Sequence, residues 1–152
     1  MTGKRKTEAR RWFQQAFHDL QATRWNIKGG FYDTACFPAQ QAGEKALKSL
    51  LYYQGARRTA LLTHSLVEMV REEEKRVGGL TGLLDQAREL DLHYIPSRYP
   101  NGIPSGYPHQ FYGKKIADQA LESADKIFST IRDFYQAQGE KEIWEIDKGE
   151  KR

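Results

Sequence analysis

Apolar side chains recur at every third or fourth position through most of this 152-residue chain. That spacing places them on one face of an α-helix, where they can pack against other helices. No segment alternates apolar and polar residues as a half-buried β-strand would. The helical spacing extends over five segments, at residues 7–27, 33–53, 65–76, 80–92 and 111–138. The sequence therefore predicts an all-α fold, an antiparallel up-and-down bundle of about five helices.

Glycine and proline separate these segments. Pairs of glycines at 29–30 and 78–79 end helices at little conformational cost. Ser65 and Glu68 match the pattern that caps a helix start. Pro38 removes a backbone donor about one turn into the second segment, so the helix either starts near it or bends there. Four prolines and two glycines between residues 96 and 108 predict the one long loop.

The length suits one domain with one core, which we place at residues 7–138. We expect residues 1–6 to form a basic flexible arm and residues 139–152 a charged flexible tail. The first 11 residues hold five Lys or Arg and one Glu. A basic end of this kind is either simply solvated or attracts RNA, DNA or acidic proteins.

Several classes of protein are excluded by what the sequence lacks. No apolar run approaches the roughly 20 residues of a membrane-spanning helix, and the basic start precedes no apolar signal segment. We therefore expect a cytoplasmic protein that does not bind membranes. Cys36 is the only cysteine and no Glu-x-x-His pair occurs, so we expect neither a metal site nor a cofactor. The glycine-rich loops that cradle phosphates are also absent.

Residues 92–117 contain no acidic side chain but many rings and cations. Cations that neutralise phosphate, beside rings that stack on bases, are what a nucleotide or a single-stranded nucleic acid requires. The stretch therefore predicts a binding loop, with candidate ligand contacts from Arg98, Tyr99, His109 and Lys114. The alternative is that Tyr94, Tyr99 and Phe111 only pin the loop onto the bundle.

Four segments, in this order, carry a resemblance to a known family: His18-Asp19-Leu20, Phe37 to Lys48 with Tyr32 before it, His64-Ser65-Leu66, and Tyr94 to Pro100. With these segments the chain resembles the HEPN domain family over about residues 8–136. The resemblance implies a helical bundle that forms a homodimer and binds nucleotide. It also implies a small nucleotidyltransferase as partner, in a two-component pair that is often a toxin and an antitoxin.

Two further polar residues are candidates for a phosphate pocket. Lys48 follows Glu44 by four positions, which favours an ion pair along the helix. Both residues also belong to the HEPN resemblance, so Lys48 can instead face phosphate beside the Arg98 loop. His64 directly precedes the predicted cap at Ser65, where a helix N-terminus favours anions.

A ribonuclease that needs no metal is the alternative function. Some HEPN proteins use an Arg followed, after four to six residues, by a catalytic His, which can take the proton of a ribose hydroxyl. That spacing occurs here for Arg88 with His93, for Arg57 or Arg58 with His64, and for Arg11 with His18, without the family's complete pattern. A third hypothesis is a non-catalytic dimeric scaffold, with Trp12 or Trp25 in the dimer face.

Overall fold

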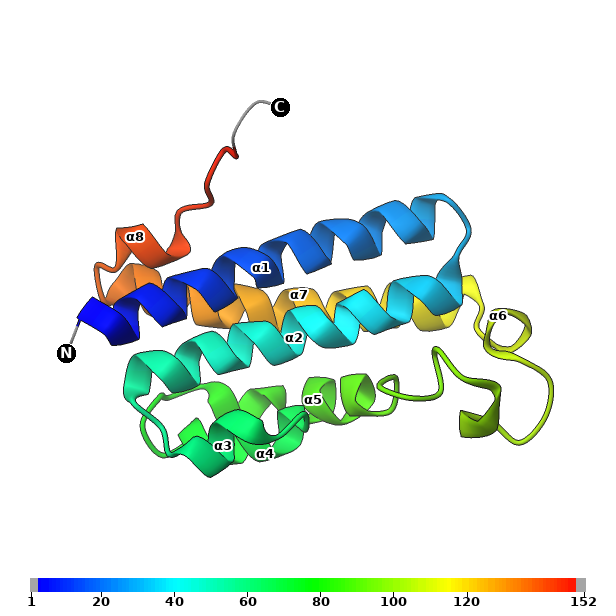
Figure 1. The fold of residues 1–152 in the computed structure, drawn as a ribbon, viewed down its shortest axis with the longest axis horizontal. Helices are drawn as coiled ribbons and strands as arrows, with labels where there is room; N and C mark the ends of the chain where they lie inside the picture. Colours follow the sequence, from blue (N-terminus) through cyan, green and yellow to red (C-terminus); the bar gives the residue numbers. More distant parts are fainter. Residues whose placement is uncertain (1–2, 150–152) are drawn as a thin grey trace.

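The computed structural model describes residues 3–149 and confirms the all-α bundle (Figure 1). Within these residues no strand occurs, and no helix is both long and apolar enough to cross a bilayer. Two short 3₁₀ segments, η1 (Leu80–Leu83) and η2 (Pro100–Gly102), accompany eight α-helices: α1 (Gly3–Lys28), α2 (Tyr32–Gln54), α3 (Arg58–Leu62), α4 (Leu66–Glu73), α5 (Leu84–Asp91), α6 (Pro108–Phe111), α7 (Lys114–Ala137) and α8 (Lys141–Trp144).

The bundle is antiparallel, as predicted. α1 and α2 form a hairpin, α7 packs against both, and α4 and α5 cover another side of α2 (Figure 1). The five expected helices correspond to α1, α2, α4, α5 with η1, and α7. Three short helices, α3, α6 and α8, lie in segments where no helix was expected. α2 starts at Tyr32 and continues through Pro38.

Close approach of the helices depends on small residues in α2. A Cβ at Gly43 would lie 2.7 Å from Leu66 Cδ2 and 2.9 Å from Leu90 Cδ1, so only glycine lets α4 and α5 approach this closely. On the other side of the core, Phe13 of α1 stacks on Phe128 of α7 with 4.5 Å between ring centroids. Close packing of this kind makes α2 a rigid support for the side chains on its outer face.

Both ends of the described chain differ from the expected flexible arm and tail. Residues 3–6 form the first turn of α1, and part of the tail forms α8. Lys6 Nζ pairs with Glu140 Oε1 at 3.0 Å, and Ile143 is buried in the core. An apolar anchor and an ion pair therefore hold these segments against the bundle. Residues 1, 2 and 150–152 of the predicted arm and tail lie outside the described residues.

The start of α4 is capped from two sides. Ser65 Oγ accepts a hydrogen bond from the backbone N–H of Glu68 at 3.2 Å, which confirms the predicted cap. Asp91, the last residue of α5, accepts hydrogen bonds from the first two backbone N–H groups of α4 at 2.7 and 3.2 Å. Ser65 Oγ also donates to this carboxylate at 3.0 Å. These contacts fix the chain at the position of His64.

Candidate nucleotide-binding surface

Arg98 lies against three aromatic rings. Its guanidinium carbon is 3.9 Å from the ring centroid of Phe37 on α2, and 5.0 and 5.1 Å from those of Tyr94 and Tyr99. Arg98 Nε and Nη2 also donate to the backbone carbonyl of Tyr94 at 2.9 and 2.6 Å. Cation–π contacts and hydrogen bonds together hold the guanidinium in one place, which lowers the entropy that a ligand must remove on binding.

A cleft of about 380 Å³ opens beside this cluster. Arg98 and Ser97 form one wall, and Phe37 and Pro38 of α2 contribute the apolar surface. Pro38 has no N–H, so the carbonyl of Thr34, which also lines the cleft, receives no helical hydrogen bond from it. The cleft therefore offers an apolar ring and a guanidinium, the groups that contact a nucleobase and its phosphate, and its lining also includes Asp33.

A second cluster lies farther along α2. The carboxylate of Glu44 is buried; its Oε2 is 3.2 Å from Lys48 Nζ, and its Oε1 is 3.2 Å from both Gln40 Nε2 and His64 Nδ1. Lys48 is buried as well, whereas the His64 side chain is 58% exposed. Contact between Nδ1 and a buried carboxylate leaves Nε2 as the imidazole nitrogen that a ligand can reach.

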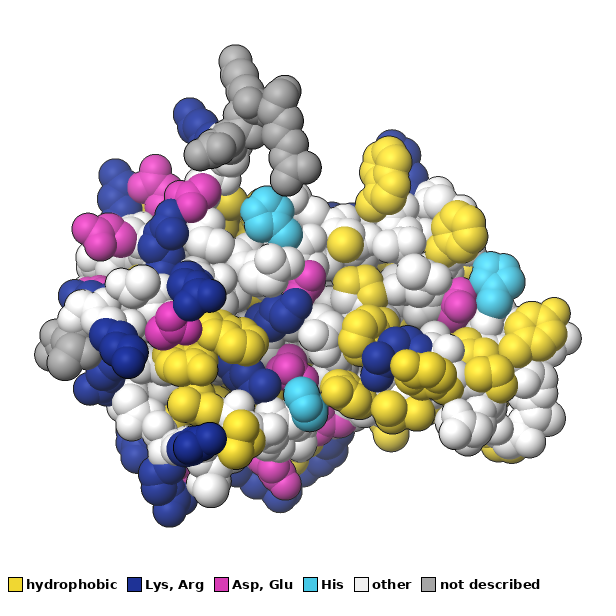
Figure 2. Space-filling model, viewed as in Figure 1, with side chains coloured by type: hydrophobic (Ala, Val, Ile, Leu, Met, Phe, Trp, Pro, Cys, Tyr) yellow, Lys and Arg dark blue, Asp and Glu magenta, His cyan; other side chains and the backbone are white. Residues whose placement is uncertain are grey.

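Tyr94 joins the two clusters. The His64 and Tyr94 rings are 5.1 Å apart at an interplanar angle of 33°, and Tyr94 in turn contacts Arg98. We call the connected residues Lys48, Glu44, His64, Tyr94, Arg98 and Phe37 the α2 strip. Figure 2 shows hydrophobic side chains gathered around Lys or Arg side chains on this face of the molecule.

The structure brings together four of the predicted binding residues, Lys48, His64, Arg98 and Tyr99. Lys48 lies beneath the surface and supports Glu44, because its charge is already paired. Phe37 and Gln40 were not singled out for a role from the sequence. No spacing reveals that a loop far along the chain places Arg98 on the Phe37 ring, and Gln40 contacts Glu44 within α2 itself.

His109 and Lys114 lie outside the strip. His109 Nδ1 is 2.9 Å from Asp33 Oδ1, and Asp33 lines the cleft, so His109 is adjacent to it. Lys114 instead pairs with Asp118 on the exposed face of α7 at 2.6 Å. Tyr99 is 49% exposed and Phe111 58% exposed, so neither ring pins the loop onto the bundle; Tyr94 alone of the three is partly buried.

Arg88 and His93 occupy different environments. Arg88 is exposed and pairs with Asp85 at 3.2 Å. His93 is 7% exposed, and its Nδ1 is 3.1 Å from the hydroxyl of Tyr112. Burial lowers the pKa of His93 to about 4, so this imidazole is neutral at physiological pH. The described structure therefore places His93 in the core, where RNA does not reach it, and this pair does not form the accessible Arg–His site that its spacing suggested.

Within residues 3–149, no group of three or more His, Cys, Asp or Glu side chains is placed to hold a metal ion.

The chain is similar to known proteins over most of its length. The HEPN domain family model matches residues 9–134. A putative toxin of Methanocaldococcus jannaschii is 25% identical over 132 residues, which cover 83% of this chain and 87% of the toxin. A Thermus thermophilus protein of known structure is 35% identical with a TM-score of 0.77, covering 83% of this chain and 97% of that one. The structure of an archaeal HEPN homologue is 32% identical with a TM-score of 0.69, covering 84% and 97%.

Proposed function

Because the chain belongs to the HEPN domain family, we propose that it is the nucleotide- or RNA-binding component of a two-component, toxin–antitoxin-type pair. Its partner would be a nucleotidyltransferase, and the protein would act as a cytoplasmic homodimer. The putative toxin among its relatives supports the pairing. The observation that carries the binding proposal is Arg98, held among aromatic rings beside a cleft of about 380 Å³.

The chemistry of the α2 strip suits such a ligand. A base can stack on the exposed ring of Tyr99 or on the Phe37 wall of the cleft. Hydrogen bonds among residues 3–149 use two of the five N–H groups of Arg98, and the others can donate to phosphate oxygens. His64 offers Nε2 to a further phosphate or to a ribose hydroxyl.

Equilibrium binding of ATP, GTP and a short single-stranded RNA tests the proposal. Loss of a charge-assisted hydrogen bond and of a stacking partner predicts at least tenfold weaker binding for Arg98→Ala. Arg88→Ala is the control, because it removes the same side chain at an exposed position outside the strip. Equal affinities of the two variants for every ligand would refute the binding site.

The pairing with a nucleotidyltransferase has its own test. Co-expression of the chain with the nucleotidyltransferase from a neighbouring reading frame should yield a stable complex on size exclusion. Sedimentation of the chain alone at micromolar concentration should show a dimer. A monomer that binds no such enzyme would contradict both expectations, whatever the outcome with nucleotides.

The contact between Glu44 and His64 favours a second candidate, a ribonuclease that needs no metal. A buried carboxylate that orients the imidazole prepares Nε2 to remove the proton of a 2′-hydroxyl. Labelled single-stranded RNA incubated with a chelator should then be cleaved by the wild type and by His93→Ala but not by His64→Ala. Intact RNA with the wild type would eliminate this candidate.

A further inference from the structure

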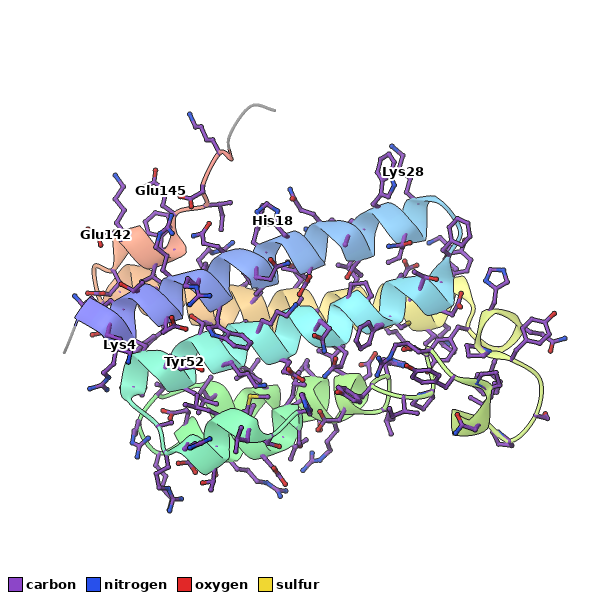
Figure 3. The ribbon with its side chains drawn as sticks, in the orientation of Figure 1. Lys4, His18, Lys28, Tyr52, Glu142 and Glu145 are labelled. Carbon is purple, nitrogen blue, oxygen red and sulfur yellow. The ribbon has the colours of Figure 1, made fainter. Side chains whose placement is uncertain are left out.

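A second aromatic groove lies at the other end of the same face. It encloses about 560 Å³ between α1, α2 and the segment that follows α8, and its walls include Arg10, Arg11, Trp12, Lys45, Tyr52 and Asp147. The Trp12 and Tyr52 rings stack with 5.8 Å between centroids and 26° between planes. Tyr52 projects from the end of α2 that lies near the start of α1 (Figure 3).

The groove and the α2 strip meet at the buried side chain of Lys48. Lys48 Nζ, the last group of the strip, lies 5.4 Å from the ring centroid of Trp12. From Phe37 to Tyr52 the strip and the groove together follow α2 over about 22 Å of helix axis. At about 3.4 Å per nucleotide, a stacked single strand of roughly six nucleotides has that length. A mononucleotide can occupy only one end.

Two of the three cationic side chains in the groove, those of Arg10 and Arg11, form ion pairs that are partly exposed to solvent. Arg11, whose side chain is 68% exposed, pairs with Glu8, whereas Lys45 forms a mostly buried pair with Asp19 at 2.7 Å. Arg10 pairs with Asp147, whose side chain is 58% exposed. Surface ion pairs contribute little to stability, so an RNA phosphate can replace such a carboxylate at small cost. Three cationic side chains face two carboxylates in the groove, and one of those carboxylates is Asp147.

Asp147 belongs to the segment that follows α8. Residues 145–149, here called the C-terminal strap, lie beyond the part of the chain that the HEPN model matches. Gln14 of α1 holds the strap and the end of α8 in place: its amide donates to the carbonyls of Ile143 and Glu145 at 3.1 and 2.9 Å and accepts from the N–H of Asp147 at 3.0 Å. Figure 3 shows Glu142 and Glu145 beside the first half of α1.

We propose that the Trp12–Tyr52 groove is a second stacking platform for single-stranded RNA, and that the C-terminal strap competes with RNA for it by placing Asp147 on Arg10. This inference rests on the proposed binding function of the α2 strip. The aromatic pair supplies stacking that tolerates any base, and the cations supply phosphate contacts. The buried Lys48, paired with Glu44 and 5.4 Å from the Trp12 ring, places the two platforms next to each other along α2.

The first test compares charge removal at two places on the full chain. Asp147→Asn frees Arg10 while keeping the backbone contact to Gln14; Asp133→Asn removes an exposed charge on α7 as a matched control. Fluorescence anisotropy with a labelled oligouridine of about nine nucleotides should show severalfold tighter binding to Asp147→Asn than to Asp133→Asn. The dependence of log K on log salt should steepen by about 0.7, as expected for one added phosphate contact.

The second test removes the platform. Trp12→Ala should weaken binding of the nine-nucleotide RNA about tenfold, the effect of one lost stacking contact, and should leave binding of ATP and of a trinucleotide unchanged. Circular dichroism confirms that the variant is folded; if it is not, Arg11→Ala, with an exposed side chain, should weaken only the longer RNA by severalfold.

The outcomes separate this inference from the proposed function. Equal affinity of Asp147→Asn and Asp133→Asn for the longer RNA would overturn the role of the strap. Wild-type RNA affinity in Trp12→Ala would overturn the platform. Loss of the dimer without loss of RNA affinity in this variant would identify the groove as a protein interface. Arg98→Ala in the same assays tests the α2 strip independently of the groove. If this variant loses ATP binding, the proposed function stands even when the groove variants bind RNA like the wild type.

Discussion

Replacement of Glu73 by glutamine should change how the stability of the protein depends on pH. Glu73, at the end of α4, is fully buried. Its Oε1 accepts a hydrogen bond from Arg76 at 3.0 Å, whereas its Oε2 is buried with no hydrogen-bond partner among the described residues. Burial raises the pKa of this carboxyl from 4.5 to about 7, although the Arg76 charge acts in the opposite direction.

The pKa shift fixes both the sign and the size of the effect. Because the folded protein holds the Glu73 proton more tightly than the unfolded chain, stability is greatest below pH 4.5 and falls as the pH rises towards 7. At 1.36 kcal/mol per pKa unit the loss is about 3 kcal/mol. Buried His93 acts in the opposite sense. Folding lowers its pKa from 6.5 to about 4, so the unfolded chain holds this proton more tightly than the folded protein does. The free energy of unfolding therefore increases by about 3 kcal/mol as the pH rises from 4 to 6.5.

The two residues should therefore offset each other in the wild type between about pH 4.5 and 6.5. Urea unfolding followed by circular dichroism at a series of pH values measures this directly. Glu73→Gln removes the group whose ionisation lowers the stability as the pH rises. The free energy of unfolding of the variant, relative to that of the wild type, should therefore rise by about 3 kcal/mol between pH 4.5 and 7.5. Glu122→Gln, at an exposed site on α7, should leave the profile unchanged. A Glu73→Gln profile parallel to that of the wild type would show that Glu73 does not take up a proton in this pH range.

Two further variants test the packing that supports the strip. Asp91→Ala removes the carboxylate that caps α4, and urea unfolding should show a loss of about 1 to 2 kcal/mol; an unchanged midpoint would show that Ser65 alone caps the helix. Gly43→Ala should destabilise the protein by about 1 to 3 kcal/mol, although alanine favours helix, because its Cβ would lie 2.7 Å from Leu66. A higher melting temperature for this variant would show that α4 can move aside.

The spacing of apolar residues was sufficient to predict the main helices, because burying one face of a long helix requires a repeated pattern. Phe13 and Leu20 of α1 and Ile127 and Ile131 of α7 are buried as their spacing indicated. The short helices α3, α6 and α8 were missed because about one turn of helix carries no repeat. The attachment of the C-terminal segment through Gln14 is a contact between distant parts of the chain, which no local pattern shows.

The candidate site was predictable in composition but not in geometry. The acid-free stretch pointed to Arg98 and Tyr99, and both lie in one cluster. The sequence did not reveal that Phe37 completes this cluster, or that Tyr94 joins it to His64, because these contacts depend on how the loop folds back over α2. The spacing of Arg88 and His93 did not reveal that His93 is buried and contacts the hydroxyl of Tyr112, 19 residues farther along the chain.

An NMR titration of the isotope-labelled chain with a short oligouridine tests most directly whether the α2 strip is the binding surface. We expect the largest shifts at the Arg98 side-chain Nε–H and at the backbone amides of Phe37, His64 and Tyr94, and we expect these shifts to saturate together. Shifts confined to other faces of the bundle, or no shifts at saturating RNA, would contradict this expectation.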